Sequence, residues 1–267
     1  MSLLIVIPVR NEEARLAPGL TLLAQRLQAC GFGDYGVVVS DNGSSDGTAA
    51  LARACGDPRV SYLRACEQGD KGAAIAAGWA TASSSVTVLA YVDVDMATDP
   101  EALVRGYRLI ADGHADVVLG SRWHRAARVV GRSLRRGFLS GGLALAWRLL
   151  PGGVVRDPGC GLKLFRRSTW QALPPVAGGF AYGAEGAELA ARRGALVESI
   201  PVTWTDDDAG RIRLGRAARD YARAWIATSG RWTSASTSPR QRGRTGRSAG
   251  AASADQRPAS RRHHARA

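Results

Sequence analysis

The stretch VTVLAYVDVD (residues 86–95) joins an apolar run to two carboxylates, Asp93 and Asp95. An uninterrupted apolar run of this length is typical of a strand that is buried on both faces of a parallel sheet. Because open α/β sheets bind their ligands at the carboxyl ends of the strands, we expect both carboxylates at a ligand-binding edge. Such a pair can hold a divalent cation against a diphosphate. A second Asp-x-Asp pair, Asp206 and Asp208, means that the neighbouring sequence must decide between the two.

Apolar runs and amphipathic patterns alternate on both sides of this strand. Other strands are predicted at residues 3–9, 35–41, 59–63 and 115–121, and helices at 12–28, after 46, at 71–82 and at 99–111. Farther along come a basic connector at 122–136, an apolar helix at 138–150, the run CGLKLF at 160–165, a helix at 185–193, a strand at 196–204 and a helix at 215–227. The alternation predicts an α/β fold with a doubly wound, mostly parallel sheet flanked by helices. Asp93 and Asp95 follow the fourth strand of this series, which favours them over the later pair.

The composition changes sharply near residue 229. We predict one catalytic domain over residues 1–228, with halves of about 1–120 and 121–228, and a disordered tail over residues 229–267, where aliphatic residues are nearly absent. The tail has nine Arg and one Asp, and so carries +8 of the formal net charge of +13. An anionic membrane surface is the partner that we expect for it. Nucleic acid, which we do not favour, and an unselected Arg-rich composition are the alternatives.

Cysteine usage and the first residues both point to the cytoplasm. Cys30, Cys55, Cys66 and Cys160 are scattered without a C-x-x-C pair, which argues against a disulfide framework and a structural zinc site. The start MSLLIVIPVR lacks the features of a signal peptide. The apolar stretch at 138–155 is interrupted by a charge and a proline, so we do not expect it to span a bilayer.

Polar residues follow the first two predicted strands, in VIPVRNEEARL (6–16) and SDNGSSDGT (40–48). Adjacent parallel strands end at one edge, so these motifs place Pro8, Val9, Arg10, Glu12 and Asp41 together, an arrangement that suits a nucleotide's base and ribose. The alternative is that these residues only cap helices and form turns.

Lys71 lies between two glycines, Gly69 and Gly72, at the predicted start of a helix. Free amides at a helix start and one cation suit phosphate oxygens. The alternative is an ordinary solvated lysine. The chain has only one other lysine, Lys163, which also lies in a glycine-containing motif.

These motifs together carry a resemblance. VIPVRNEEARL, VVVSDNGSSDGT, DKGAAIAAGW, YVDVDM, VVLGSR and DPGCGLKLF resemble, in order and spacing over residues 3–213, the inverting glycosyltransferases of the GT-A fold, family 2 type. The GSR motif, the basic segment and the D-x-x-CG-x-K-x-F element resemble the branch of the polyprenyl- and dolichyl-phosphate mannose and glucose synthases. Cys160, Gly161 and Lys163 are closer to the glucose type.

The resemblance implies a role for each motif. The five residues of the first two motifs and Lys71 would bind a UDP- or GDP-hexose, with Lys71 on the diphosphate. Asp93 and Asp95 would hold Mg²⁺ or Mn²⁺. The acceptor phosphate would be bound by Ser121, Arg122 and Arg132. The catalytic set would be Asp93, Asp95, Arg122 and Glu185.

The sequence also departs from the family pattern. Asn42, Ala97, Gly183 and Gly210 replace residues that relatives use. The third departure leaves Glu185 alone where relatives have an Asp as well, and the fourth alters the loop at 205–213.

We therefore expect a metal-dependent hexosyltransferase that transfers glucose or mannose to a polyprenyl phosphate, peripherally bound at the cytoplasmic face of the membrane. A lipid monophosphate is mostly ionised near pH 7, so this reaction needs no strong general base. An integral membrane protein is a further candidate partner. The alternatives are transfer to a lipid, polysaccharide or protein hydroxyl, and a weakly catalytic protein that binds nucleotide sugar or RNA.

Overall fold

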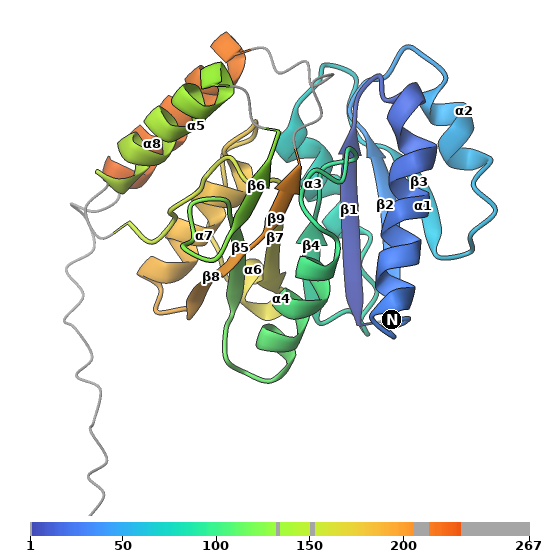
Figure 1. The fold of residues 1–267 in the computed structure, drawn as a ribbon, viewed down its shortest axis with the longest axis horizontal. Helices are drawn as coiled ribbons and strands as arrows, with labels where there is room; N and C mark the ends of the chain where they lie inside the picture. The colour runs from blue at the N-terminus through green and yellow to red at the C-terminus, as the bar shows by residue number, and fades with distance from the viewer. Residues whose placement is uncertain (1, 132–133, 150–152, 206–213, 231–267) are drawn as a thin grey trace, which may run out of the picture. The chain divides into compact units, whose positions relative to one another are not determined.

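A computed structural model of the chain describes residues 2–131, 134–149, 153–205 and 214–230 (Figure 1). The predicted tail lies outside these ranges from residue 231 onward. In the described residues, one sheet has the strand order β3-β2-β1-β4-β7-β5-β8. Its strands are β1 (Leu3–Val9), β2 (Tyr35–Asp41), β3 (Val60–Arg64), β4 (Val88–Tyr91), β5 (Val117–Ser121), β7 (Lys163–Arg166) and β8 (Val197–Pro201).

Strand direction sets the functional edge of this sheet. Strand β7 is antiparallel to both of its neighbours, β4 and β5. The other paired strands of the sheet are parallel. Strand β1 lies between β2 and β4, so the strand order reverses there, which is where such sheets bind ligands. The mostly parallel sheet that the sequence predicted is confirmed.

Alternate residues of β1 face two separate apolar layers. Leu3, Ile5 and Ile7 pack with α1 (Glu13–Ala29), α2 (Thr48–Arg53) and α4 (Glu101–Ala111). Leu4 and Val6 pack with α3 (Lys71–Ala80), α6 (Arg167–Gln171) and α7 (Tyr182–Arg192) on the other face (Figure 1). A strand buried on both faces accounts for the uninterrupted apolar run in its sequence.

The second half differs from the sequence prediction in several elements. Part of the predicted connector at 122–136 forms β6 (Arg128–Val130), which pairs in parallel with β9 (Thr203–Thr205). The predicted strand at 196–204 is thus two strands, β8 and β9. Helix α7 begins at Tyr182, three residues before the predicted start, and the short helix α6 was not predicted. Short elements carry too few residues to show a period.

Helices α5 (Leu134–Arg148) and α8 (Leu214–Gly230) lie side by side (Figure 1). The Trp147 and Tyr221 rings meet edge to face at 5.9 Å, and Trp225 Nε1 donates to Ala146 O at 3.1 Å. Among the described helices, none combines the length and the hydropathy that crossing a membrane requires.

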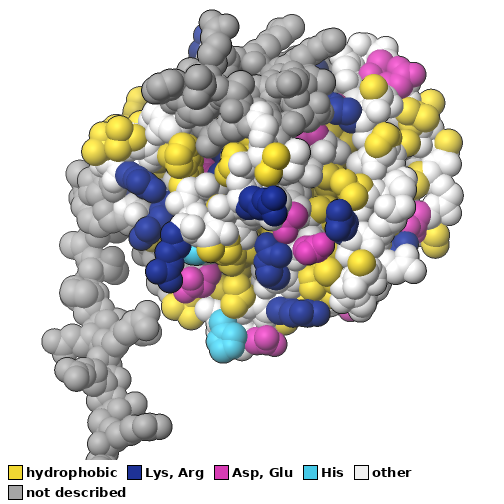
Figure 2. Space-filling view, viewed as in Figure 1, with side chains coloured by type: hydrophobic (Ala, Val, Ile, Leu, Met, Phe, Trp, Pro, Cys, Tyr) yellow, Lys and Arg dark blue, Asp and Glu magenta, His cyan; other side chains and the backbone are white. Residues whose placement is uncertain are grey.

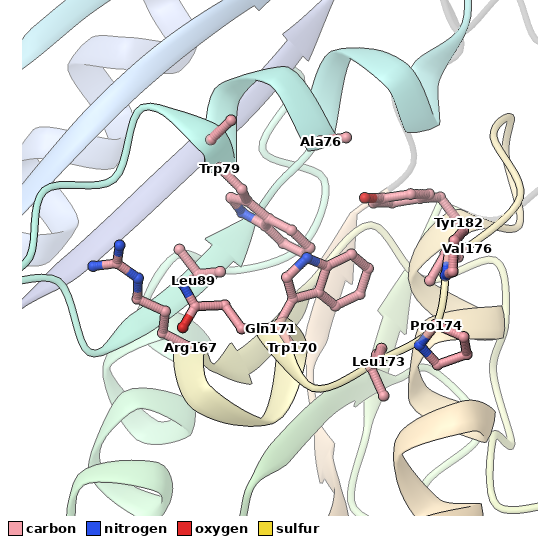
Figure 3. Close-up of a pocket in the computed structure, with 12 residues that line it drawn as sticks. Ala76, Trp79, Leu89, Arg167, Trp170, Gln171, Leu173, Pro174, Val176 and Tyr182 are labelled. Carbon is pink, nitrogen blue, oxygen red and sulfur yellow. The ribbon is translucent and has the colours of Figure 1, made fainter.

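An aromatic cluster fills the space between α3, α6 and α7 (Figure 3). The Trp79 and Trp170 ring centroids are 4.6 Å apart, and Tyr182 is 5.2 Å from Trp170. A cavity of about 450 Å³ opens beside these rings. Its lining comes from α3, α6, the loop after α6 and the start of α7, together with Leu89 of β4.

Glu188 attaches the end of α5 to the core. Its carboxylate is fully buried in α7 and accepts hydrogen bonds from Trp147 Nε1 (3.0 Å), Val154 N (3.1 Å) and Val155 N (2.9 Å). Three buried donors would lose their partner if the carboxylate were removed.

We expect Glu188→Ala to lower the free energy of unfolding by about 3 kcal/mol, because each buried donor left without a partner costs about 1 kcal/mol or more. Urea denaturation followed by circular dichroism measures the loss. Glu198→Ala, at an exposed carboxylate on β8, is the matched control and should change stability by less than about 0.5 kcal/mol. Equal stability of the two variants would contradict this role of Glu188.

Candidate active site

The two carboxylates of the opening motif lie just beyond β4, at the edge where β1 and β2 also end. Asp93 Oδ1 accepts a 2.6 Å hydrogen bond from Lys71 Nζ, at the start of α3. Asp95 Oδ1 accepts from Ala97 N at 3.1 Å. Burial, and next the charge of Asp93, raise the pKa of Asp95. The two half-buried carboxylates, Asp93 and Asp95, therefore lie close enough to repel each other.

A third carboxylate adds to this crowding. Glu12, at the start of α1, forms an ion pair with Arg15, whose Nη2 is 2.6 Å from Glu12 Oε2. Burial raises the pKa of Glu12, and the charges of Asp95 and Asp93 contribute in the same direction. These charges act over short distances, so the three carboxylates share one neighbourhood.

The end of β2 is held by hydrogen bonds to Asp41, which is fully buried. Oδ1 accepts from Ser44 N at 2.8 Å, and Oδ2 accepts from Tyr62 OH at 2.8 Å and from Arg64 Nη1 at 3.0 Å. Burial raises the pKa of Asp41, but these hydrogen bonds outweigh burial and lower it. Both carboxylate oxygens of Asp41 therefore already accept hydrogen bonds from within the protein. The neighbouring Asn42 Oδ1 accepts from Cys66 Sγ at 2.9 Å.

The loop after β1 is fixed against the loop after β2. Asn11 has a left-handed backbone, with φ of 56°, and its Oδ1 accepts from Ser45 N at 2.8 Å. Arg10 is exposed and lies against Gly69, where an added Cβ would come 1.8 Å from Nη1. Pro8 is half-buried and Val9 is buried. The structure thus brings together the strand-end residues that the sequence placed at one edge.

Arg122, just past the end of β5, makes a buried ion pair with Asp157. Nη2 and Nε donate to the two carboxylate oxygens at 2.7 and 2.9 Å, and Arg122 N donates at 2.9 Å. The side chains of Arg122 and Asp157 are 9% and 0% exposed. The pair raises the pKa of Arg122 despite burial and lowers that of Asp157 despite burial. Ser121, also buried, accepts from Trp123 N at 3.3 Å.

The loop at 157–161 lies between the Arg122–Asp157 ion pair and Asp93. A Cβ on Gly161 would lie 2.2 Å from Asp93 Oδ2, so the backbone there approaches the carboxylate closely. Lys163 Nζ donates to Cys160 O at 2.7 Å and to Pro158 O at 3.2 Å. Burial lowers the pKa of Lys163 to about 8. The sequence singled out Lys163 because lysine is rare in this chain, but it did not predict that the Lys163 ammonium would hold the backbone of the loop at 157–161.

Comparison with known proteins assigns the family. Residues 4–173 match the family model described as glycosyl transferase family 2. The chain belongs to glycosyltransferase family 2. It is 31% identical over 220 residues to the polyprenol monophosphomannose synthase of Mycolicibacterium smegmatis, covering 79% of this chain and 80% of that one.

Two further relatives have related names. The chain is 28% identical over 228 residues to the dolichyl-phosphate beta-glucosyltransferase of Drosophila melanogaster (79% of this chain, 69% of that one). It is 27% identical over 217 residues to the glycosyltransferase AglD of Haloferax volcanii (79% and 34%), and so matches about a third of that relative's length.

A solved structure confirms the fold. The glucosyl-3-phosphoglycerate synthase of Mycobacterium tuberculosis, crystallised with Mn²⁺, UDP and phosphoglyceric acid, superposes with a TM-score of 0.65 at 19% identity. The match covers 86% of this chain and 78% of that one. The glycosyltransferase therefore has the GT-A fold that the sequence motifs predicted.

Gly183, one of the departures from the family pattern, and Glu185 both lie on helix α7 of the glycosyltransferase. A Cβ on Gly183 would lie 2.5 Å from Tyr91 OH and 2.6 Å from Lys163 Cδ, so these side chains fill the space beside it. Residues two apart on a helix face different directions. Glu185, 1% exposed, accepts from Ala177 N at 3.1 Å. Its predicted catalytic role stays a prediction.

Several predicted residues fall outside the described part of the chain. Arg132 and the loop at 206–213, with Asp206, Asp208 and Gly210, are among them. In the predicted basic connector at 122–136, Arg125 and Arg128 are exposed, and Arg128 is the first residue of β6. Within the described residues, no three His, Cys, Asp or Glu side chains form a complete metal site.

We expect Asp157→Asn to lower the free energy of unfolding by about 3 kcal/mol at pH 7, because Arg122 would stay buried without a charged partner. Folding lowers the pKa of Asp157, so its stabilising contribution is present above about pH 4 and is lost as the pH falls through the lower, folded pKa. The difference from the wild type should therefore shrink in acid.

Urea denaturation at a series of pH values measures this difference. Asp112→Asn, at an exposed carboxylate that follows α4, is the control. A stability difference that stays constant from pH 7 to pH 3 would show that the charge of Asp157 is not what stabilises the loop.

Proposed function

We propose that this glycosyltransferase is metal-dependent and inverting, and that it transfers glucose or mannose from a UDP- or GDP-sugar to a polyprenyl phosphate. The observation that carries the proposal is the carboxylate pair Asp93 and Asp95 beside Lys71, joined through the loop at 157–161 to Arg122. Two of the relatives are named polyprenol monophosphomannose synthase and dolichyl-phosphate beta-glucosyltransferase, which supports a polyprenyl phosphate as the acceptor.

Asp93 and Asp95 are the residues that would hold Mg²⁺ or Mn²⁺. Carboxylate oxygens are the ligands that these cations take, and a dication would relieve the repulsion that raises the pKa of Asp95. Two protein carboxylates are an incomplete set, which fits a cation that also binds water and substrate phosphate. Such a cation supplies charge stabilisation to the departing diphosphate.

The donor would lie along the ends of β1 and β2. Pro8, Val9, Arg10 and Glu12 would contact the nucleoside. Asp41 would support the same site by fixing the backbone around Asn42, since its own oxygens bind Ser44, Tyr62 and Arg64. Lys71 would donate to the diphosphate, where a flexible ammonium can follow the phosphate oxygens.

The acceptor phosphate would bind on the other side of the loop at 157–161, at Ser121 and Arg122. Arg132, which lies outside the described residues, is the third residue proposed to bind it. Arg122 is mostly used by Asp157, so its part is to fix this edge and to add positive charge. An ionised phosphate oxygen can attack the anomeric carbon without a strong base. In-line attack opposite the diphosphate inverts that carbon. Glu185 completes the proposed catalytic set.

We propose that the glycosyltransferase binds peripherally at the cytoplasmic face of a membrane, and the surface of helices α5 and α8 supports the membrane contact. Leu145 on α5, Leu149 directly after its end and Ile226 on α8 are 61%, 70% and 66% exposed. Side chains three or four positions apart on a helix are neighbours, so exposed arginines adjoin these apolar residues. They are Arg148 and Arg223. Figure 2 shows hydrophobic side chains at the surface in the region of these helices. Exposed apolar side chains bordered by basic ones suit an anionic bilayer.

We expect Asp95→Ala to lower kcat/KM by about a hundredfold or more, because it removes a group that stabilises the leaving diphosphate. Purified protein is incubated with labelled UDP- and GDP-hexoses, Mn²⁺ and detergent-dispersed polyprenyl phosphate, and lipid products are identified by mass spectrometry. Asp57→Ala is the control, because Asp57 pairs with Arg59 before the start of β3 and so does not lie at the carboxyl ends of the strands. Products on hydroxyl acceptors alone, with phosphate lipids inert, would refute the proposed acceptor.

We expect the double variant Leu145→Glu, Leu149→Glu to bind vesicles of phosphatidylglycerol at least about tenfold more weakly than the wild type, because two apolar contacts become charged. Vesicle sedimentation measures the binding. Leu51→Glu, at an exposed leucine on α2, is the matched control and should bind as the wild type does. Unchanged binding by the double variant would refute this surface as the membrane contact.

A further inference from the structure

Lys71 is held in place from two directions at the start of α3. The helix is capped by Asp70, whose Oδ1 accepts from Ala73 N at 2.9 Å and from Gly179 N at 2.7 Å. Gly72 touches the same glycine segment, since a Cβ there would lie 2.8 Å from Gly179 N. The helix start that carries Lys71 is therefore fixed, and only its side chain has freedom to move.

The ammonium of Lys71 lies among a carboxylate and two aromatic rings. Nζ is 2.6 Å from Asp93 Oδ1, 5.7 Å from the Tyr91 ring centroid and 5.9 Å from the Phe180 ring centroid. The Lys71 side chain is 21% exposed and that of Asp93 is 39% exposed. The lysine thus reaches solvent, and its charge compensates the carboxylate that we assign to the cation.

We propose that Lys71 is the internal counter-ion of Asp93 in the nucleotide-free protein, and that a nucleoside diphosphate exchanges it for the divalent cation. This inference rests on the proposed function, because it assigns Asp93 to the cation and Lys71 to the diphosphate. It adds an order of events: the nucleotide draws the ammonium away from Asp93, and the carboxylate oxygen then becomes available to the cation.

The distribution of charge supports an exchange over simultaneous binding. Glu12 is paired with Arg15 and Asp93 with Lys71, so two of the three carboxylates already have cationic partners. A dication on Asp93 with the ammonium still 2.6 Å from the same carboxylate would bring like charges together. A diphosphate offers Lys71 several anionic oxygens, and the four-carbon stem lets the ammonium move from one partner to the other.

The exchange predicts that nucleotide and cation bind cooperatively. A cation that binds alone must displace Lys71, whereas a cation that follows the nucleotide does not. By linkage, the factor by which nucleotide raises cation affinity equals the factor by which cation raises nucleotide affinity. Lys71 contributes to this coupling in addition to direct contact between cation and phosphate.

The test is Lys71→Met, which keeps the length of the side chain and removes its charge. We expect Mn²⁺ alone to bind this variant about fivefold more tightly than the wild type, because Asp93 loses its competing partner. UDP alone should bind several-fold more weakly, and the coupling factor between UDP and Mn²⁺ should fall. Isothermal titration calorimetry and the electron paramagnetic resonance signal of free Mn²⁺ measure each constant, with GDP as a second probe.

Arg108→Met removes the same unit charge from an exposed position on α4 and is the matched control, with expected wild-type binding constants. Thermal unfolding followed by circular dichroism checks that both variants fold. If Lys71→Met binds Mn²⁺ alone no more tightly than the wild type, while the wild type binds Mn²⁺ with nucleotide, the exchange is wrong and the donor site stands. If the wild type binds Mn²⁺ with neither UDP nor GDP, both the exchange and the metal-dependent function fail.

Discussion

Strand β7 is the constraint on which the site depends, because it lies between the strand that leads to Asp93 and the strand that leads to Arg122. It runs against both neighbours, so its first residue, Lys163, lies at the edge where those strands end. The chain must reach that edge before β7 can begin, and it does so through the loop at 157–161. A parallel β7 would leave this loop at the opposite edge. The direction of one short strand therefore joins the two halves of the site.

Buried charge holds this loop, at a cost that apolar packing would avoid. Asp157 and Lys163 are almost completely buried, and burial opposes the charged form of each. Replacing such groups by apolar residues often stabilises a protein, so stability alone does not explain them. Directional hydrogen bonds fix the backbone against Arg122 and Asp93 more narrowly than apolar contact does. The proposed function gives this cost a purpose, because a diphosphate donor and a phosphate acceptor would have to be held at a fixed spacing.

The first half of the fold could be predicted from the sequence. Uninterrupted apolar runs such as residues 3–9 and 86–95 indicate buried strands, and their alternation with amphipathic segments indicates a parallel sheet. The direction of β7 and the pairing of β6 could not, because periodicity does not encode which strands are neighbours. The same limit applies to the site. Strand ends predicted Asp41 and Asp93 at one edge, which is where β2 and β4 end in the structure, whereas the partner of Arg122 lies 35 residues away and has no local signal.

The chain contains two lysines in opposite surroundings, Lys71 partly open to solvent and Lys163 enclosed. An amine-reactive reagent should therefore acylate one side chain, apart from the α-amino group, without any engineered cysteine. A molecule that binds at this sheet edge would shield Lys71 from the reagent. The scarcity of lysine thus turns the contrast between a buried and an exposed side chain into a chemical footprint of occupancy at the sheet edge.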